Sequence, residues 1–346
     1  MSLELRELEN LSDQLPIASR ILRMSRFLHY LPRNHYRANK LVTGVAALTF
    51  LRVASFYAAS PALPQREQVE RNQTSGLSRD IGSQRRPTES GVFTQDNAFG
   101  KQVILQEKPK QSAFQVFGEV AAFYTSNALL SRDGAEGDSF VNATAGLGWR
   151  HNFNDRLTLA ISGRYSIYRY NQFSALDFQS VDADVRLGYT LFKHWELAVG
   201  YGFTRLTSRG ESEAFYTGHS VDVGLQRVFE VSSAHHIVVG LSPSWSVADP
   251  SAAQRDKYTA YAAWYWRLSD RFATNLAYRY GYYVYRGGDA GRRDHNHTVS
   301  LSAQYDLTDW LALTASGYAT WNRSNLPDFN YAAWNLGGSV GLNARF

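Results

Sequence analysis

The C-terminal stretch, residues 331–346, constrains the fold more than any other part of the chain. Every second side chain back from Phe346 is uncharged, and the indole of Trp334 is the only hydrogen-bonding group among them. The intervening side chains, which end with Arg345, are polar or small. Because successive side chains of a strand point to opposite faces, this pattern predicts one long strand with an apolar and a polar face. It is longer than most strands of soluble proteins.

Composition agrees with strands that cross a membrane. Aromatic residues make up 14% of the chain, with 21 Tyr and 8 Trp, and these side chains favour a membrane–water boundary. The mean hydropathy of −0.36 excludes a helical membrane protein but not a barrel, because only alternate residues of a barrel face lipid. The chain has no cysteine, so disulfides, thiolate zinc sites and cysteine nucleophiles are excluded.

The net charge of +5 is unevenly distributed. From Ser112 onward there are 20 Lys and Arg against 21 Asp and Glu, so the positive excess lies before this residue. A folded part without cationic excess argues against nucleic acid as a partner.

Residues 1–62 predict a signal or leader region. Residues 1–40 are basic, residues 41–60 are apolar apart from Arg52, and Ser60-Pro61-Ala62 supplies small residues for a cleavage site. A single transmembrane helix that anchors the chain is the alternative, although the apolar run is short for one and contains a charge.

Residues 63–111 are rich in Gln, Arg, Ser, Pro and Glu and show no sustained periodicity. Such a composition buries too little apolar surface to order itself. We therefore predict a flexible periplasmic segment, with a plug that enters the barrel as the alternative.

From Ser112 to the end, long alternating runs are joined by tight and loose connections in turn. The tight turns are marked by residues spaced 37 to 40 apart, namely Asp155, Lys193, Ser233, Asp270 and Asp309. A period near forty also suits a propeller, but a propeller blade fits four short strands into that length, and only two long ones fit here. We expect strands at about 113–125, 140–153, 156–170, 180–192, 195–206, 216–229, 236–247, 257–268, 272–285, 295–307, 310–322 and 331–346.

This pattern predicts an all-β fold, a single transmembrane antiparallel up-and-down β-barrel of about 12 strands over residues 112–346. An even strand number, short turns on one side and long loops on the other are typical of outer-membrane barrels. A sheet that crosses lipid must close on itself, because lipid offers no hydrogen bonds to a free edge. Both ends of the barrel sequence then lie on the periplasmic side.

The two faces of the predicted strands indicate which side meets lipid. Leu301, Val185 and Leu342 lie on the apolar face, and Asp306 and Arg186 lie on the polar face. A soluble sandwich or barrel with an apolar core is the alternative. Aromatic residues gather at both ends of the apolar face, which suits the two interfaces of a bilayer. At the tight-turn end these are Phe192, Trp195, Phe229, Phe272, Trp310 and Phe346; at the loop end they are Trp245, Tyr258, Tyr282, Trp321 and Trp334.

The polar face places charges of both signs in the barrel interior. The candidate pore-lining residues are Arg150, Arg164, Asp182, Asp184, Arg186, Glu196, Asp222, Arg267, Arg279 and Asp306. Facing acidic and basic groups create a transverse field that selects small polar solutes. Alternatively, the charges pair across the interior and fill it, because a twelve-stranded barrel is intermediate in width.

No catalytic constellation emerges, and we predict that the chain is not an enzyme and needs no cofactor. His219 and Ser220 are adjacent, so they point to opposite faces, whereas a barrel phospholipase needs both on one face. Asp294-His295 lacks the one-residue spacing that an omptin-like protease needs. His295 and His297 share a face but have no evident third metal ligand.

The turns Leu268-Ser269-Asp270-Arg271-Phe272 and Leu307-Thr308-Asp309-Trp310-Leu311, together with the C-terminal Gly341-Leu342-Asn343-Ala344-Arg345-Phe346, resemble those of Gram-negative outer-membrane β-barrel proteins, most closely the putative β-barrel porin families. The resemblance implies a bacterial outer-membrane location, contact with outer-membrane lipid and lipopolysaccharide, and recognition of the C-terminal strand by the barrel-assembly machinery. It also implies passive transport of a small polar solute. A non-conducting barrel that serves as an anchor or as an export or assembly partner, for example for envelope polysaccharide, is the alternative, and a barrel hydrolase is a third hypothesis.

Overall fold

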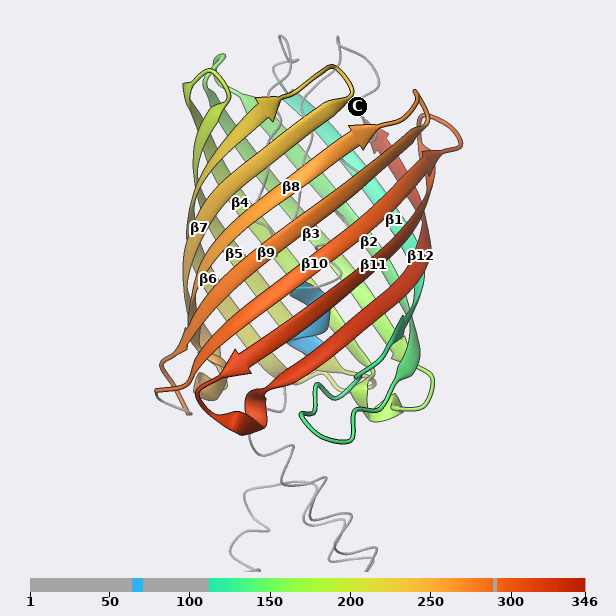
Figure 1. Cartoon of the computed structure of the whole chain (residues 1–346), viewed down its shortest axis with the longest axis vertical. Helices are drawn as coiled ribbons and strands as arrows, with labels where there is room; N and C mark the ends of the chain where they lie inside the picture. Colours follow the sequence, from blue (N-terminus) through green and yellow to red (C-terminus); the bar gives the residue numbers. More distant parts are fainter. Residues whose placement is uncertain (1–63, 71–111, 289–290, 346) are drawn as a thin grey trace, which may run out of the picture. The chain divides into compact units, whose positions relative to one another are not determined.

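The computed structural model describes residues 64–70, 112–288 and 291–345. Residues 112–345 form twelve long strands (Figure 1). Their bounds are β1 (Ser112–Thr125), β2 (Asp138–Asn152), β3 (Leu157–Tyr170), β4 (Phe178–Phe192), β5 (Trp195–Ser208), β6 (Ala214–Glu230), β7 (His235–Asp249), β8 (Arg255–Arg267), β9 (Phe272–Tyr285), β10 (Arg293–Asp306), β11 (Leu311–Ser324) and β12 (Tyr331–Arg345).

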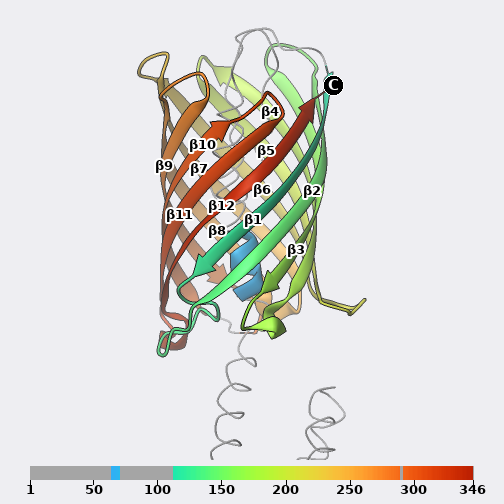
Figure 2. The ribbon, with the colours of Figure 1, turned by 90° about the vertical axis from the view of Figure 1, so that its right-hand side faces the viewer.

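The strands form one closed antiparallel barrel in which each strand pairs with its neighbours in sequence. The ring closes between β1 and β12, from Gln115 opposite Arg345 to Thr125 opposite Asn335. Figures 1 and 2 show the tilted strands, with tight turns at the upper end and long loops at the lower end. The up-and-down barrel of about twelve strands is therefore confirmed.

The outer wall of the barrel is apolar and the inner wall is polar. Leu301, Val185 and Leu342 are 58%, 40% and 49% exposed, whereas Asp306 and Arg186 are each 7% exposed. A soluble barrel has the opposite arrangement, with its charges outside. The predicted orientation of the two faces is confirmed, and it suits a wall surrounded by acyl chains. Among the described residues, no helix has the length and apolar character needed to span a membrane.

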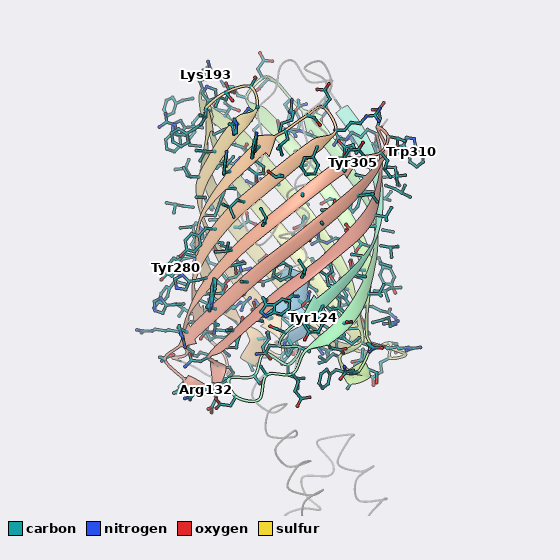
Figure 3. All side chains as sticks on the ribbon, turned by 45° about the vertical axis from the view of Figure 1, so that its right-hand side comes forward. Tyr124, Arg132, Lys193, Tyr280, Tyr305 and Trp310 are labelled. Atoms are coloured by element: carbon teal, nitrogen blue, oxygen red, sulfur yellow. The ribbon has the colours of Figure 1, made fainter. Side chains whose placement is uncertain are left out.

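Aromatic side chains ring both ends of the outer wall. At the tight-turn end, Phe192 and Trp310 are 72% and 55% exposed, and Figure 3 shows Trp310 and Tyr305 near this rim. At the loop end, Trp321 and Trp334 are 41% and 50% exposed. Two such belts are what the two interfaces of a bilayer favour.

Four of the tight turns share one hydrogen-bonding device. The Oδ1 atom of Asn154 accepts hydrogen bonds from the backbone N–H groups of Arg156 and Leu157, each at 2.8 Å. The hydroxyls of Ser232, Ser269 and Thr308 each accept two turn N–H groups in the same way, at 3.0 to 3.3 Å. Short polar side chains that bond to backbone two and three residues ahead favour turns over continued strand, which explains why the strands end here.

Several strands extend about two residues beyond their predicted ends on the loop side, so that β8 begins at Arg255 and β10 at Arg293. Backbone pairing continues there although the apolar alternation has stopped, since Arg255 pairs with Tyr285 and Arg293 with Val284. Three loops on this side contain short 3-10 helices, at Ser174–Leu176, Ser251–Ala253 and Pro327–Phe329.

Residues 64–70 form a short helix, which Figures 1 and 2 show in blue within the ring of strands, in the half that carries the long loops. For residues 64–70 the plug alternative describes the structure better than a flexible segment does, and the assignment of residues 63–111 as a whole to a flexible periplasmic segment stays a prediction. The charged side chains of the helix find partners on the barrel wall, which composition alone does not show. Residues 71–111 lie outside the described residues, as does the leader region 1–62.

Candidate functional site

Arg255, at the loop end of β8, joins the short helix to the barrel wall. Its Nη1 donates to Oε1 of Glu67 at 2.6 Å, and its Nη2 donates to Oε1 of Glu70 at 2.7 Å. Nζ of Lys257, two residues along β8 and on the same face, lies 3.4 Å from the Glu70 carboxylate. Arg255 and Glu67 are 1% and 2% exposed at their side chains, so this ion pair is almost fully removed from water.

Two tyrosines of β9 hold Arg255 in place. Nη1 of Arg255 donates to the Tyr285 hydroxyl at 3.0 Å, and its guanidinium carbon lies 4.5 Å from the centre of the Tyr283 ring. A guanidinium stacked on an aromatic face in this way is stabilised by the ring quadrupole. A Cβ on Gly281 would lie 2.5 Å from the Tyr283 ring, so only glycine leaves room for this ring position.

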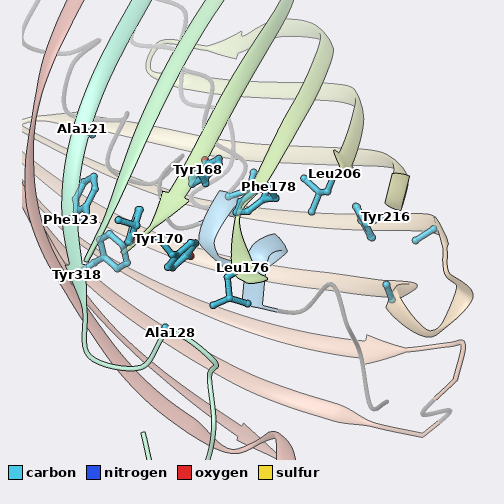
Figure 4. Close-up of a cluster of buried hydrophobic side chains, with 14 residues drawn as sticks. Ala121, Phe123, Ala128, Tyr168, Tyr170, Leu176, Phe178, Leu206, Tyr216 and Tyr318 are labelled. Carbon is cyan, nitrogen blue, oxygen red and sulfur yellow. The ribbon is translucent and has the colours of Figure 1, made fainter. Parts of the chain in front are cut away.

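The opposite side of the helix meets an apolar and amide-rich wall. Val69 is 4% exposed and belongs to the aromatic cluster at the loop end of the interior, which includes Phe123 and Phe178 (Figure 4). Nε2 of Gln68 donates to the Tyr318 hydroxyl at 3.0 Å, and Nδ2 of Asn335 donates to Oε1 of Gln68 at 3.3 Å. The helix is thus held on several sides of the interior.

The electrostatic balance at Glu70 favours its ionised form. Burial alone would raise the pKa of Glu70, but the positive charges of Arg255, Lys257 and two further arginines hold this pKa well below its usual value of 4.5. The carboxylate is therefore charged at neutral pH, as its ion pairs require.

A second group of charges lies on β3 to β6 and contains five of the predicted pore-lining residues. Nε of Arg164 lies 3.4 Å from Asp182 Oδ2, and the Thr204 hydroxyl donates to Asp182 Oδ1 at 2.8 Å. On the neighbouring strands, Arg186 lies 3.6 Å from Asp222 and 4.0 Å from Glu196. The structure brings these five residues together as ion pairs, with Arg164–Asp182 and Arg186–Glu196 between adjacent strands and Arg186–Asp222 across β5.

The other five predicted residues also lie on the inner wall. Arg279 on β9 donates to Asn296 at 3.3 Å and to Thr298 at 3.4 Å, and Asp306 on β10 accepts from Gln304 at 2.6 Å. Arg150 on β2, Asp184 on β4 and Arg267 on β8 lie at inward-facing positions of their strands. That these ten predicted residues line a conducting path stays a prediction.

With this geometry in place, comparison with known proteins is informative. The family model described as TonB dependent receptor-like, beta-barrel matches residues 70–344. The chain belongs to this family. It is a β-barrel of the bacterial outer membrane, as the apolar outer wall and the two aromatic belts also indicate.

Solved structures similar to this TonB-dependent-receptor-like barrel include other outer-membrane barrels. The COG4313 outer membrane channel from Pseudomonas putida F1 is 13% identical, with 68% of this chain and 97% of that chain covered and a TM-score of 0.46. The translocator domain of autotransporter NalP from Neisseria meningitidis is 12% identical, with 69% and 90% covered and a TM-score of 0.41. These similarities concern the fold alone. No curated protein matches the chain.

Beside the helix, Arg292 connects two loops of the TonB-dependent-receptor-like barrel. The guanidinium carbon of Arg292 lies 4.0 Å from the Tyr285 ring centre and 3.5 Å from that of Phe329, and its Nε donates to Asp294 at 3.0 Å. Burial would lower the pKa of Arg292, but Tyr285 and the hydrogen-bonded Asp294 raise it. The β9–β10 loop is thereby tied to the β11–β12 loop.

The histidines considered as metal ligands lie on the outer wall of the barrel. Nδ1 of His295 and the Tyr280 hydroxyl are 2.7 Å apart, and His297 and the Tyr278 hydroxyl are 2.8 Å apart. The structure gives both imidazoles a tyrosine partner at the aromatic belt.

Sequence reasoning missed the helix carboxylates and Arg255. Residues 64–70 are too few to show a helical period, although Pro64 is a residue typical of a first helical turn. Arg255 was assigned to a loop, but it has the same parity as Arg267 of the same strand, whose inward position was predicted. Extending the inward–outward alternation of this strand two residues before its predicted start would have placed Arg255 on the inner wall.

Proposed function

We propose that this outer-membrane barrel is a channel for passive diffusion of small hydrophilic solutes, closed at its loop end when the 64–70 helix is docked. The observation that carries the proposal is the polar inner wall, on which charges of both signs face each other, as in the pairs Arg164–Asp182 and Arg186–Asp222. Such an arrangement produces a transverse field that favours polar solutes over apolar ones.

The docked helix supports a closed state for this channel. Six of its residues, Gln65 to Glu70, are each at most 6% exposed, and their partners lie on β8, β11 and β12. A segment held by ion pairs on one side and by apolar contacts on the other is a natural two-state element, because the ion pairs are lost together when it leaves.

Planar-bilayer recording of the refolded full chain tests the proposal. We expect low conductance from the unchanged chain and a higher open probability from the double variant Glu67→Gln/Glu70→Gln, in which the contacts with Arg255 lose their charge. The matched control is Glu211→Gln/Glu213→Gln, which removes the same charge from an exposed loop at the same end. Silence of both double variants at all voltages would contradict a channel.

A non-conducting barrel is the second candidate, and the burial of the interior charges favours it. Arg186, Asp182 and Glu196 are 7%, 2% and 4% exposed, as expected if paired charges fill the interior. In that case the barrel is an anchor or an export partner. The bilayer experiment separates the two functions, since a filled barrel stays silent when the helix is released. That the chain is not an enzyme remains a prediction.

The partners also remain proposals. The exposed aromatic belts suit contact with outer-membrane lipid and lipopolysaccharide. Strand β12, with its alternating apolar face, suits recognition by the barrel-assembly machinery.

A further inference from the structure

The inner wall leaves two cations at the loop end for which it supplies no carboxylate. Elsewhere on the wall, two arginines pair with wall carboxylates, Arg164 with Asp182 and Arg186 with Asp222. Among the described residues, the ion pairs of Arg255 and Lys257 are instead made with the carboxylates of the helix.

Two carboxylates at the loop end, Asp256 on β8 and Asp294 on β10, are already engaged by other arginines. Asp256 lies 2.9 Å from Arg286, and Asp294 forms its ion pair with Arg292. Among the described residues, the ion pairs of these two cations are therefore made by Glu67 and Glu70, and Glu70 also lies 3.5 Å from Arg66 of the helix itself. Burying such charges without a partner is costly, so the site requires an occupant.

The site is also built to orient a carboxylate. The Arg255 guanidinium donates to two different carboxylates, from Nη1 to Glu67 and from Nη2 to Glu70. The Tyr285 hydroxyl accepts from Nη1, and the Tyr283 ring supports the guanidinium plane. Within the described part of the chain, the buried Nε of Arg255 and the buried Tyr283 hydroxyl have no hydrogen-bond partner, so the helix does not use all of the site's polar atoms.

We propose that Arg255, Lys257, Tyr283 and Tyr285 form a binding site for a small solute that carries two or more carboxylates, and that Glu67 and Glu70 occupy this site in its absence. The inference rests on the proposed channel function and gives that channel a solute class. The helix is then an internal competitor. A polycarboxylate that enters from the loop side displaces the helix carboxylates from Arg255, and its own entry opens the path.

Isothermal titration of the refolded full chain in detergent with citrate tests the site without ion flow. Because the docked helix reduces the fraction of chains able to bind, Glu67→Gln/Glu70→Gln should bind citrate at least about tenfold more tightly than the unchanged chain. In the same background, adding Arg255→Gln/Lys257→Gln should weaken citrate binding by more than about tenfold. The control Arg209→Gln, an exposed cation at the same end, should leave binding within about twofold.

A spin label provides a second measurement, and the retained β-sheet circular dichroism of each variant shows that it has folded. The label is attached at Pro64→Cys, since the chain has no other cysteine. Citrate should raise its mobility, and glucose should not. Equal citrate binding with and without Arg255 and Lys257, or no citrate binding by Glu67→Gln/Glu70→Gln, would overturn the site. A chain that binds citrate but stays silent in bilayers would instead refute the channel and leave the site standing.

Discussion

Arg255 and Glu67 are 188 positions apart in the chain, yet their side chains meet at 2.6 Å in the barrel interior. The contact joins a residue that precedes the barrel sequence to the start of its eighth strand. Because both side chains are almost fully buried, neither can lose the other without a large cost. The docked state of the helix therefore depends on a small number of groups, which makes it accessible to single substitutions.

Arg255→Gln should release the helix. The change leaves the carboxylates of Glu67 and Glu70 buried without their principal cation, and breaking a buried pair in this way costs about 3–5 kcal/mol. We expect a nitroxide at Pro64→Cys to become mobile in this variant. The same label should stay immobile in Arg209→Gln, because the Arg209 side chain is 66% exposed and pairs with Asp177, not with the helix. An immobile label in Arg255→Gln would show that the apolar contacts of Val69 suffice for docking.

Acid should release the helix as well. The pKa of Glu70 is lowered in the docked state, so its contribution is fully present above the ordinary value of 4.5 and is lost as the pH falls through the lowered pKa. The label at Pro64→Cys should stay immobile between about pH 7 and pH 5 and become mobile only when the pH falls well below 4.5. In Glu70→Gln the increase in label mobility on acidification should be smaller. A transition that is unchanged in Glu70→Gln would assign it to another carboxyl.

The barrel fold could be predicted from the sequence because the alternation of apolar and polar residues recurs from strand to strand. Each strand carries the same alternation, so Leu301 and Val185 could be placed outside and Asp306 and Arg186 inside without any structure. The turns repeat as well, and four of the tight turns carry a short polar side chain at the same point. Errors at single positions do not disturb a pattern that recurs this often.

The candidate site was harder to predict because its parts are local and occur once. The strand ends at Arg255 and Arg293 lie beyond the apolar alternation, where only backbone pairing continues. The helix is short, and its stability comes from contacts with the wall and not from its own propensity. Such contacts between distant segments leave no periodic trace in a single sequence.

The outer wall should respond to charge according to depth. Leu301 lies in the middle part of β10 and is 58% exposed, and Leu307 lies just beyond the strand at the tight-turn end. Leu301→Arg should destabilise the folded barrel in lipid vesicles by about 2–4 kcal/mol, and Leu307→Arg by about 0–1 kcal/mol. Urea titration of the vesicle-inserted chain measures both. Equal effects at the two positions would count against a bilayer around this wall.

The turn hydroxyls should contribute measurably to stability. Ser232 accepts two backbone N–H groups, and its removal in Ser232→Ala should cost about 1 kcal/mol. Ser233→Ala changes the neighbouring side chain of the same turn and serves as the matched control. We expect a lower urea midpoint for Ser232→Ala than for Ser233→Ala. Identical midpoints would mean that water replaces the hydroxyl without loss.

Pairing of β1 with β12 has a consequence for biogenesis. The partner of β1 is synthesised after the other eleven strands, so the seam between β1 and β12 cannot close until β12 has been delivered. Until then, both outermost strands expose unpaired backbone groups, which in lipid have no substitute partner. Closure of the barrel therefore has to wait for β12, and a nascent chain that stops short of β12 keeps an open sheet edge that lipid cannot satisfy.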